Sequence, residues 1–248
     1  MDIENTLTSK IITISDPYPI WVIDNFLKLD VIKKIKNEWP SLDSKVWHTG
    51  HKYINNKKNI LEQGIHAINE YKDIPNYTAQ VLQYIHSDKF TQKISSITNI
   101  KDLITDKSFR WSGLRTLTPG SFQAIHSDAR KNPETGLRKK LTCLIYLNDG
   151  YIKERDGGVF EAWNDNMTQC IQEIEPLNNR LVIFLNSDTS YHGVTEVKSK
   201  RYAMLWSILK DEKLTDDRSK ALFVSRPQDS KEIGELGKER AYIKDAIK

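Results

Sequence analysis

Two copies of one tripeptide make histidines of this chain candidate metal ligands. His-Ser-Asp occurs at 86–88 and again at 126–128. Side chains two residues apart diverge by about 200° around a helix, but they face the same side of an extended strand. The first copy ends the helical pattern YTAQVLQYI, so we interpret His86 as a helix-end residue. The second closes the strand-like run SFQAIH, so His126 and Asp128 could share one ion, although polar residues at a strand end would look the same.

His192 supplies a third candidate ligand. It lies in another strand-like run, SYHGVTEV, well downstream of Asp128. Two neutral imidazoles and one carboxylate form a set that suits Fe(II) and leaves coordination positions open. Those positions could take a chelating keto acid and dioxygen. A closed structural zinc site would need a fourth protein ligand, and no cysteine is suitably placed.

Arg201 is a candidate for binding the far carboxylate of such a keto acid. It begins the strand-like run RYAMLWSIL, shortly after His192. A guanidinium pairs with a carboxylate through a fixed bidentate fork. An arginine at a strand edge more often forms a surface salt bridge. Its place after the last candidate ligand favours the role in binding.

The candidate ligands lie in a region of short strands separated by turns. Turn signals include Pro-Gly at 119–120 and Asn-Asp-Gly at 148–150. About seven strands without intervening helices predict an antiparallel sandwich or jelly roll. The predicted strands are SGLRTLT, SFQAIHS, LTCLIYLN, GVFEAW, RLVIFLN, SYHGVTEV and YAMLWSIL.

We expect a single domain, 1–248, with three parts. Residues 1–105 are predicted to be mostly helical, because several segments place apolar residues three and four apart. Within them, 44–56 lacks periodicity and is predicted to be irregular or β-rich. Residues 109–209 form the strand-rich core, and 210–248 form a charged, helical extension that ends in KEIGELGKERAYIKDAI.

Composition is ordinary for a soluble globular protein, with 38% hydrophobic and 28% charged residues and a formal net charge of +4. Lysines alternate with acidic residues, whereas a nucleic-acid partner would require clustered basic residues. The two cysteines provide no disulfide framework. No apolar run approaches a membrane span, and the N-terminus lacks a signal pattern, so we expect a cytoplasmic protein, of cellular, viral or phage origin.

The strand-rich region resembles the prolyl 4-hydroxylase-like branch of the 2-oxoglutarate/Fe(II)-dependent dioxygenase superfamily. Six segments carry this resemblance and follow the order of the family. They are HSD at 126–128, LTCLIYLN at 141–148, DGGVFEAW at 156–163, IEPLNNRLVIF at 174–184, YHGVTEV at 191–197 and RYAML at 201–205. The resemblance implies a fold that is mainly β with supporting α-helices, around a double-stranded β-helix (jelly-roll or cupin-like) core.

The resemblance also implies an oxidoreductase that couples decarboxylation of 2-oxoglutarate, giving succinate and CO2, to hydroxylation of a C–H bond. Fe(II), 2-oxoglutarate and O2 are then required, and ascorbate is an optional addition. By position, His126, Asp128 and His192 match the iron ligands of the family. Arg201 matches the residue that pairs with the C5 carboxylate of 2-oxoglutarate. Tyr146 matches a tyrosine that donates its hydroxyl to the same carboxylate in some members.

The chain departs from the family pattern at two points, and a third point has two interpretations. Collagen-type prolyl hydroxylases carry lysine where Arg201 stands, so the chain looks more like the oxygen-sensing and ribosomal-protein branches. A tyrosine that some members carry before the HxD strand has no match here, the nearest positions being Thr116 and Thr118. Tyr146 shares a strand face with Thr142, but it could also be a core aromatic residue.

The substrate that the resemblance suggests first is a prolyl residue of a protein or peptide. A small molecule, a free amino acid or a glycan is the alternative. A non-enzymatic β-sandwich binding module is a further alternative, and so is a cupin-like metal protein, which would not require Arg201. The loop 129–140 could flank the entrance to the site, as could Trp47, His48 and Trp163, although each of these is more often a packing residue.

Overall fold

The structure is a computed structural model that describes residues 3–4, 10–49, 53–54, 57–58, 62–212 and 221–223. In these residues, thirteen strands form one sheet and two more form a separate hairpin, β4 (Tyr53–Ile54) and β5 (Lys57–Lys58). The large sheet contains β1 (Ile11–Ile14), β2 (Ile20–Ile23), β3 (His48–Thr49), β6 (Glu62–Ile68), β7 (Leu103–Thr105), β8 (Gly113–Ser127), β9 (Arg138–Tyr146), β10 (Phe160–Trp163), β11 (Cys170–Ile174), β12 (Leu181–Leu185), β13 (His192–Val194), β14 (Arg201–Lys210) and β15 (Leu222–Phe223).

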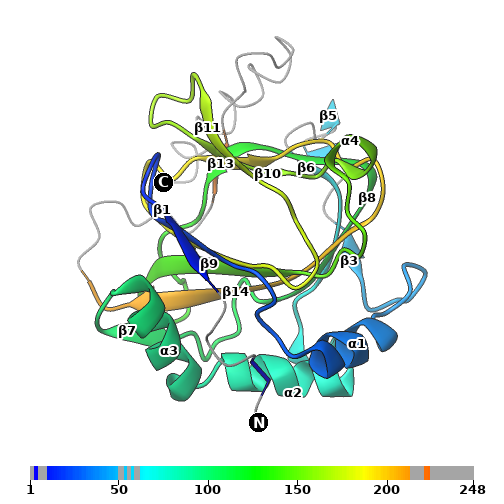
Figure 1. The fold of residues 1–248 in the computed structure, drawn as a ribbon, viewed down its shortest axis with the longest axis horizontal. Coiled ribbons are helices and arrows are strands. Elements are labelled where there is room, and N and C mark those ends of the chain that lie inside the picture. The colour runs from blue at the N-terminus through cyan, green and yellow to red at the C-terminus, as the bar shows by residue number, and fades with distance from the viewer. Residues whose placement is uncertain are drawn as a thin grey trace.

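This sheet curls into two facing layers, which Figure 1 shows end on. Its main path runs β1-β2-β12-β9-β14-β8-β13-β10-β11, and the pairings between these strands are antiparallel. Strand β8 belongs to both layers, because Gly113–Leu117 pair with β14 whereas Gln123 and His126 pair with β13. The arrangement confirms the predicted double-stranded β-helix class. It also brings the end of β8 against β13, where the candidate ligands lie.

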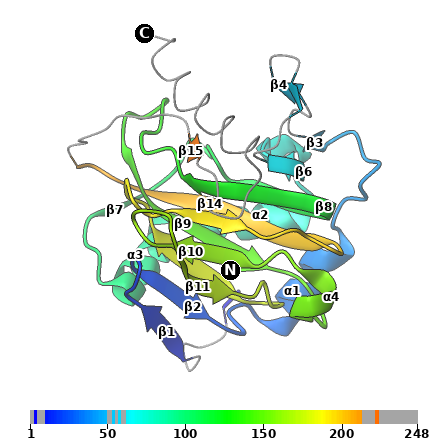
Figure 2. The ribbon, with the colours of Figure 1, turned by 90° about the horizontal axis from the view of Figure 1, so that it is seen from above.

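Three helices pack on the outer side of the layer that contains β9 and β14 (Figures 1 and 2). They are α1 (Leu29–Asn37), α2 (Asn76–Ile85) and α3 (Asp88–Thr98). The two other helical elements in the described part of the chain are short, η1 (Tyr71–Asp73) and α4 (Lys153–Asp156). Ser87 caps α3 by accepting a hydrogen bond from the backbone N–H of Phe90. Phe90 in turn meets Trp206 edge-on, with 6.0 Å between ring centroids. An apolar helix face and an apolar sheet face thus bury each other.

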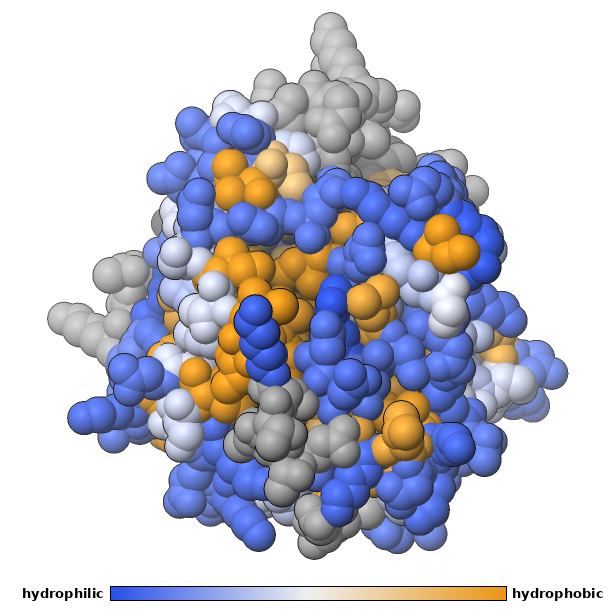
Figure 3. Space-filling model, in the orientation of Figure 1, coloured by the Kyte–Doolittle hydropathy of each residue, from blue (hydrophilic) through white to orange (hydrophobic). Residues whose placement is uncertain are grey.

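Strand β9 separates two hydrophobic cores by its alternation. Cys143 and Ile145 face the helices, whereas Leu144 and Tyr146 face the interior of the curled sheet. The interior core also holds Tyr18, Ile20, Val22, Phe160, Ala162, Ile174, Val182, Phe184 and Ala203. In the end-on view, apolar side chains gather in a hollow within a mostly hydrophilic surface (Figure 3).

Several element predictions differ from the structure. The predicted strands at 112–118 and 121–127 are one strand, β8, because Pro119-Gly120 forms an irregularity within it and Gly120 takes a φ of 82°. Strand β11, with the sequence CIQEI, was not predicted. The region 1–105 is less helical than predicted, since β1 and β2 extend the sheet beyond β12.

Two other predicted regions are described only in part. Within 44–56, the structure places β3 and β4, in keeping with the β-rich interpretation. The terminal segment KEIGELGKERAYIKDAI lies outside the described residues. In the extension predicted to be helical, residues 222–223 instead form the short strand β15. No helix in the described part of the chain is long and apolar enough to cross a membrane.

Candidate metal centre and co-substrate pocket

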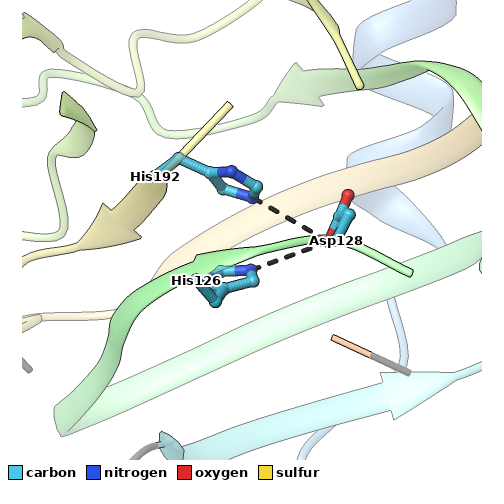
Figure 4. Close-up of side chains that lie close together, drawn as sticks. All are labelled: His126, Asp128 and His192. Atoms are coloured by element: carbon cyan, nitrogen blue, oxygen red, sulfur yellow. Dashed lines mark ion pairs between the residues drawn. The ribbon is translucent and has the colours of Figure 1, made fainter. Parts of the chain in front are cut away.

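The three candidate ligands converge on one point, although two strands supply them (Figure 4). His126 lies near the end of β8 and is paired in register with His192, the first residue of β13. Asp128 follows β8 directly. The Nε2 atoms of His126 and His192 lie 3.6 Å and 3.9 Å from Asp128 Oδ1. One ligand atom from each residue lies within 4.8 Å of the others, which is close enough to hold a metal ion.

Backbone carbonyls orient both imidazoles. Nδ1 of His126 lies 3.0 Å from the carbonyl oxygen of Ala124, and Nδ1 of His192 lies 2.9 Å from that of Ser190. These contacts assign the proton of each neutral ring to Nδ1 and leave the Nε2 lone pair directed into the site. Burial lowers the pKa of His192, although the charge of Asp128 opposes this shift. A neutral imidazole is the form that binds a metal.

Asp128 uses its two carboxylate oxygens differently. Oδ1 faces the histidines, whereas Oδ2 accepts hydrogen bonds from Lys139 Nζ at 2.6 Å, Thr142 Oγ1 at 2.9 Å and Asn186 Nδ2 at 3.3 Å. Burial raises the pKa of Asp128, but the ammonium of Lys139 and the two imidazoles lower it by more, so the net pKa lies well below the usual range. The carboxylate is therefore ionised and held in one orientation.

Arg201 and Tyr146 meet at the other end of the interior. Arg201 is 5% exposed, and its Nη2 donates to the hydroxyl of Tyr146 at 3.2 Å. Its Nε has no hydrogen-bond partner among the described residues. Gly158, with a φ of 67°, leaves room for this side chain, because a Cβ there would lie 2.9 Å from Arg201 Cδ. Burial raises the pKa of Tyr146, and Arg201 opposes that shift, so the phenol stays protonated.

Aromatic rings enclose the two histidines. Phe160 and Phe184 lie 5.5 Å and 4.6 Å from the ring of His192, between centroids. Phe223 stacks on His126, with 5.0 Å between centroids and 23° between planes. We did not predict Phe223, which belongs to β15 in the extension interpreted as helical. The short apolar run ALFV at 221–224 is the only hint of it in the sequence.

The other candidate residues lie apart from this group. His86 ends α2, as predicted, and its Nδ1 bonds to the backbone carbonyl of Asp106 at 2.9 Å. Trp47 packs in the core beside the helices, and His48 is exposed on β3. Trp163 is buried at the end of β10. None of them contributes an atom to the cluster of candidate ligands described above.

Comparison with known proteins matches part of the chain to a family. Residues 112–207 match the 2OG-Fe(II) oxygenase superfamily. No curated protein matches the chain in sequence. The match contains all three candidate ligands together with Tyr146 and Arg201.

Solved structures of prolyl hydroxylases share the fold. A prolyl hydroxylase from Trichoplax adhaerens, in complex with a hypoxia inducible factor peptide fragment, has a TM-score of 0.57 at 16% identity, over 77% of this chain and 84% of that one. A Pseudomonas putida prolyl-4-hydroxylase has a TM-score of 0.57 at 17% identity, over 78% and 93%. A viral collagen prolyl hydroxylase from Paramecium Bursaria Chlorella virus-1 has 0.50 at 14%, over 79% and 99%. Residues 112–207 thus match a family whose name implies Fe(II) and 2-oxoglutarate, and the chain shares the fold of these prolyl hydroxylases.

Proposed function

We propose that His126, Asp128 and His192 bind the iron and that Arg201, with Tyr146, binds the C5 carboxylate of 2-oxoglutarate. The convergence of two Nε2 atoms and one carboxylate oxygen carries this assignment. A set of two histidines and one carboxylate suits Fe(II) and leaves positions for a chelating ligand. The unpartnered Nε of the buried Arg201 supports the second part, because such a donor requires an acceptor.

Each residue then has a distinct task in the reaction. Iron, when bound with 2-oxoglutarate and dioxygen, supplies the oxidising chemistry that hydroxylates a C–H bond and releases succinate and CO2. The carbonyls of Ala124 and Ser190 fix the histidines, so that their Nε2 atoms need no reorganisation on metal binding. The rings of Phe160, Phe184 and Phe223 exclude water from the ligands.

For the substrate, we propose a prolyl residue in a protein or peptide. The likeness in fold to three prolyl hydroxylases supports this choice, and one of those structures holds a peptide fragment. The loop 129–140 supports it too, because it begins directly after Asp128 and its residues 133–136 are exposed. Hydroxylation of a small molecule, a free amino acid or a glycan is the second candidate.

Turnover against a peptide library tests the substrate class. The protein is incubated with Fe(II), 2-oxoglutarate and proline-containing peptides, each matched with a peptide in which alanine replaces the proline. We expect a 16 Da gain on the proline peptides alone, with an equal amount of succinate. Succinate formed without modification of any peptide, together with oxidation of a small molecule, would exclude the prolyl proposal. The absence of any iron-dependent succinate would exclude an enzyme of this class.

A further inference from the structure

Lys139 is a buried lysine that contacts the carboxylate of a candidate iron ligand. Its side chain is 4% exposed, and its Nζ lies 2.6 Å from Asp128 Oδ2. The ammonium also lies over the ring of Trp111, 5.1 Å from the centroid. Lysine is almost never fully buried unless it is paired, because its charge loses hydration. The protein therefore maintains this cation at the centre.

A β-bulge directs Lys139 into the interior. Along β9, Ile208 of β14 pairs with Leu141, but the next residue, Leu209, pairs with Lys139. The register thus skips Lys140, which is the extra residue of the bulge. Strict alternation would place Lys139 on the same side as Leu141, facing the helices. The bulge instead turns its side chain toward Asp128, and bulges commonly reorient a side chain in this way beside active sites.

The segment that carries Trp111 has an unusual backbone. Phe109 and Trp111 both have positive φ, 58° and 60°, which bulky residues rarely adopt because the conformation is strained. Asp106 anchors the segment, because its Oδ1 accepts from the N–H of Ser108 and from Nδ2 of Asn132. Surrounding contacts thus maintain a strained backbone beside the centre.

Lys139 changes the charge of the centre. With neutral imidazoles, Asp128 alone would give the ligand set a charge of −1, and Lys139 brings the total to zero. A divalent cation gains less from entering a neutral site than an anionic one, since the ammonium repels it at short range. A dicarboxylate that binds together with the metal offsets this repulsion, because its negative charge attracts both the metal and the ammonium of Lys139.

We propose that Lys139 makes metal binding depend on 2-oxoglutarate, so that the metal binds weakly alone and more tightly with the co-substrate. This inference rests on the proposed ligands. Lys139 is a positioning residue, because it acts through Asp128 and through its charge without touching the reacting atoms. Thr142 and Asn186 still hold Oδ2 when the lysine is replaced, so charge and position can be separated by mutation.

Titration of Co(II) into the metal-free protein, with and without 2-oxoglutarate, tests the inference. Lys139→Gln and Lys139→Met remove the charge, and the first retains a donor. We expect both to tighten Co(II) binding alone by on the order of tenfold and to reduce the further tightening caused by 2-oxoglutarate. Lys139→Arg keeps the charge and should behave like the wild type. Thr142→Val removes one donor without changing the charge, so it should weaken both affinities equally.

Two results would overturn the inference. One is an unchanged ratio between the two Co(II) affinities in both uncharged variants. The other is weaker binding in them, in parallel with Thr142→Val, which would mean that Lys139 only holds the carboxylate. His126→Ala separates these results from failure of the proposed ligands. If Co(II) binds this variant as it binds the wild type, the ligand assignment itself is wrong.

Discussion

At the scale of single residues, the sequence indicates the proposed metal ligands better than their surroundings. The spacing of His126 and Asp128 is informative because two residues apart on a strand share one face. Lys139 shows the opposite case, since the stretch RKK at 138–140 looks like an exposed basic run. Its burial depends on a bulge and on Trp111, contacts that are set by distant parts of the chain.

Replacement of Arg201 should weaken 2-oxoglutarate binding without loss of the metal. Arg201→Met removes a buried guanidinium whose Nε has no hydrogen-bond partner among the described residues. A charge-assisted hydrogen bond contributes about 1.5–3 kcal/mol, so KM for 2-oxoglutarate should rise roughly tenfold to a hundredfold. Succinate release measured against 2-oxoglutarate concentration gives this value.

Two controls accompany Arg201→Met. Arg201→Lys keeps the charge but not the fork, so its KM should lie between those of the wild type and the methionine variant. Co(II) affinity without 2-oxoglutarate should not change in either variant. A normal KM in Arg201→Met would show that the C5 carboxylate binds elsewhere.

At the scale of elements, strands with runs of apolar residues were predictable, whereas β11 and β15 were not. Strands β9, β12 and β14 have runs of apolar residues that match their burial on both faces. Strand β11 contains Gln and Glu and gave no signal, because its register is set by pairing with β10. Strand β15 has only two residues, and its pairing to β8 brings Phe223 onto His126.

Removal of the Phe223 ring should expose His126, one of the proposed metal ligands. In Phe223→Ala, His126 loses its stacked partner, and water gains access to the ligands. Aromatic pairs contribute about 0.5–1.5 kcal/mol, so Co(II) should dissociate about two- to tenfold faster. Competition with a chelator measures the rate. Phe223→Leu keeps apolar bulk and should lie nearer the wild type; an unchanged rate in both variants would mean that β15 does not cover the centre.

His86, at the end of α2, should make folding stability depend on pH. Burial lowers its pKa from 6.5 to about 4, and the hydrogen bond with the carbonyl of Asp106 only partly opposes this. Between pH 4 and pH 6.5, the imidazole of His86 is protonated in the unfolded chain but neutral in the folded one. The free energy of unfolding is therefore not reduced by His86 above pH 6.5, and it decreases as the pH falls toward 4. The loss is on the order of 3 kcal/mol.

Denaturant unfolding of the wild type and of His86→Gln, at several pH values, measures this contribution. The variant cannot titrate at this position, so its free energy of unfolding should fall less between pH 6.5 and pH 4. Parallel curves for the two proteins across this window would show that His86 is not a buried neutral imidazole in solution.

At the scale of the whole molecule, the curled sheet joins the two ends of the proposed site. Strand β9 provides Thr142, which donates a hydrogen bond to Asp128, and Tyr146, which accepts one from Arg201. Its other face packs on the helices. The fold class could be predicted because strand runs and turn signals alternate without helices. The contributions of β2 and β15 could not, because these strands pair with β12 and β8, which are distant in sequence, and β1 joins the sheet only through β2.

The central claim is that the iron is bound by His126 and His192, which the pairing of β8 with β13 brings together. The other copy of the tripeptide, His86-Ser87-Asp88, does not bind it. Iron-dependent succinate release from 2-oxoglutarate tests it most directly, in the wild type, His126→Ala and His86→Gln. We predict that His126→Ala loses this activity to the level without iron, and that His86→Gln keeps it at a pH where the variant is folded. Wild-type succinate release by His126→Ala would contradict the account.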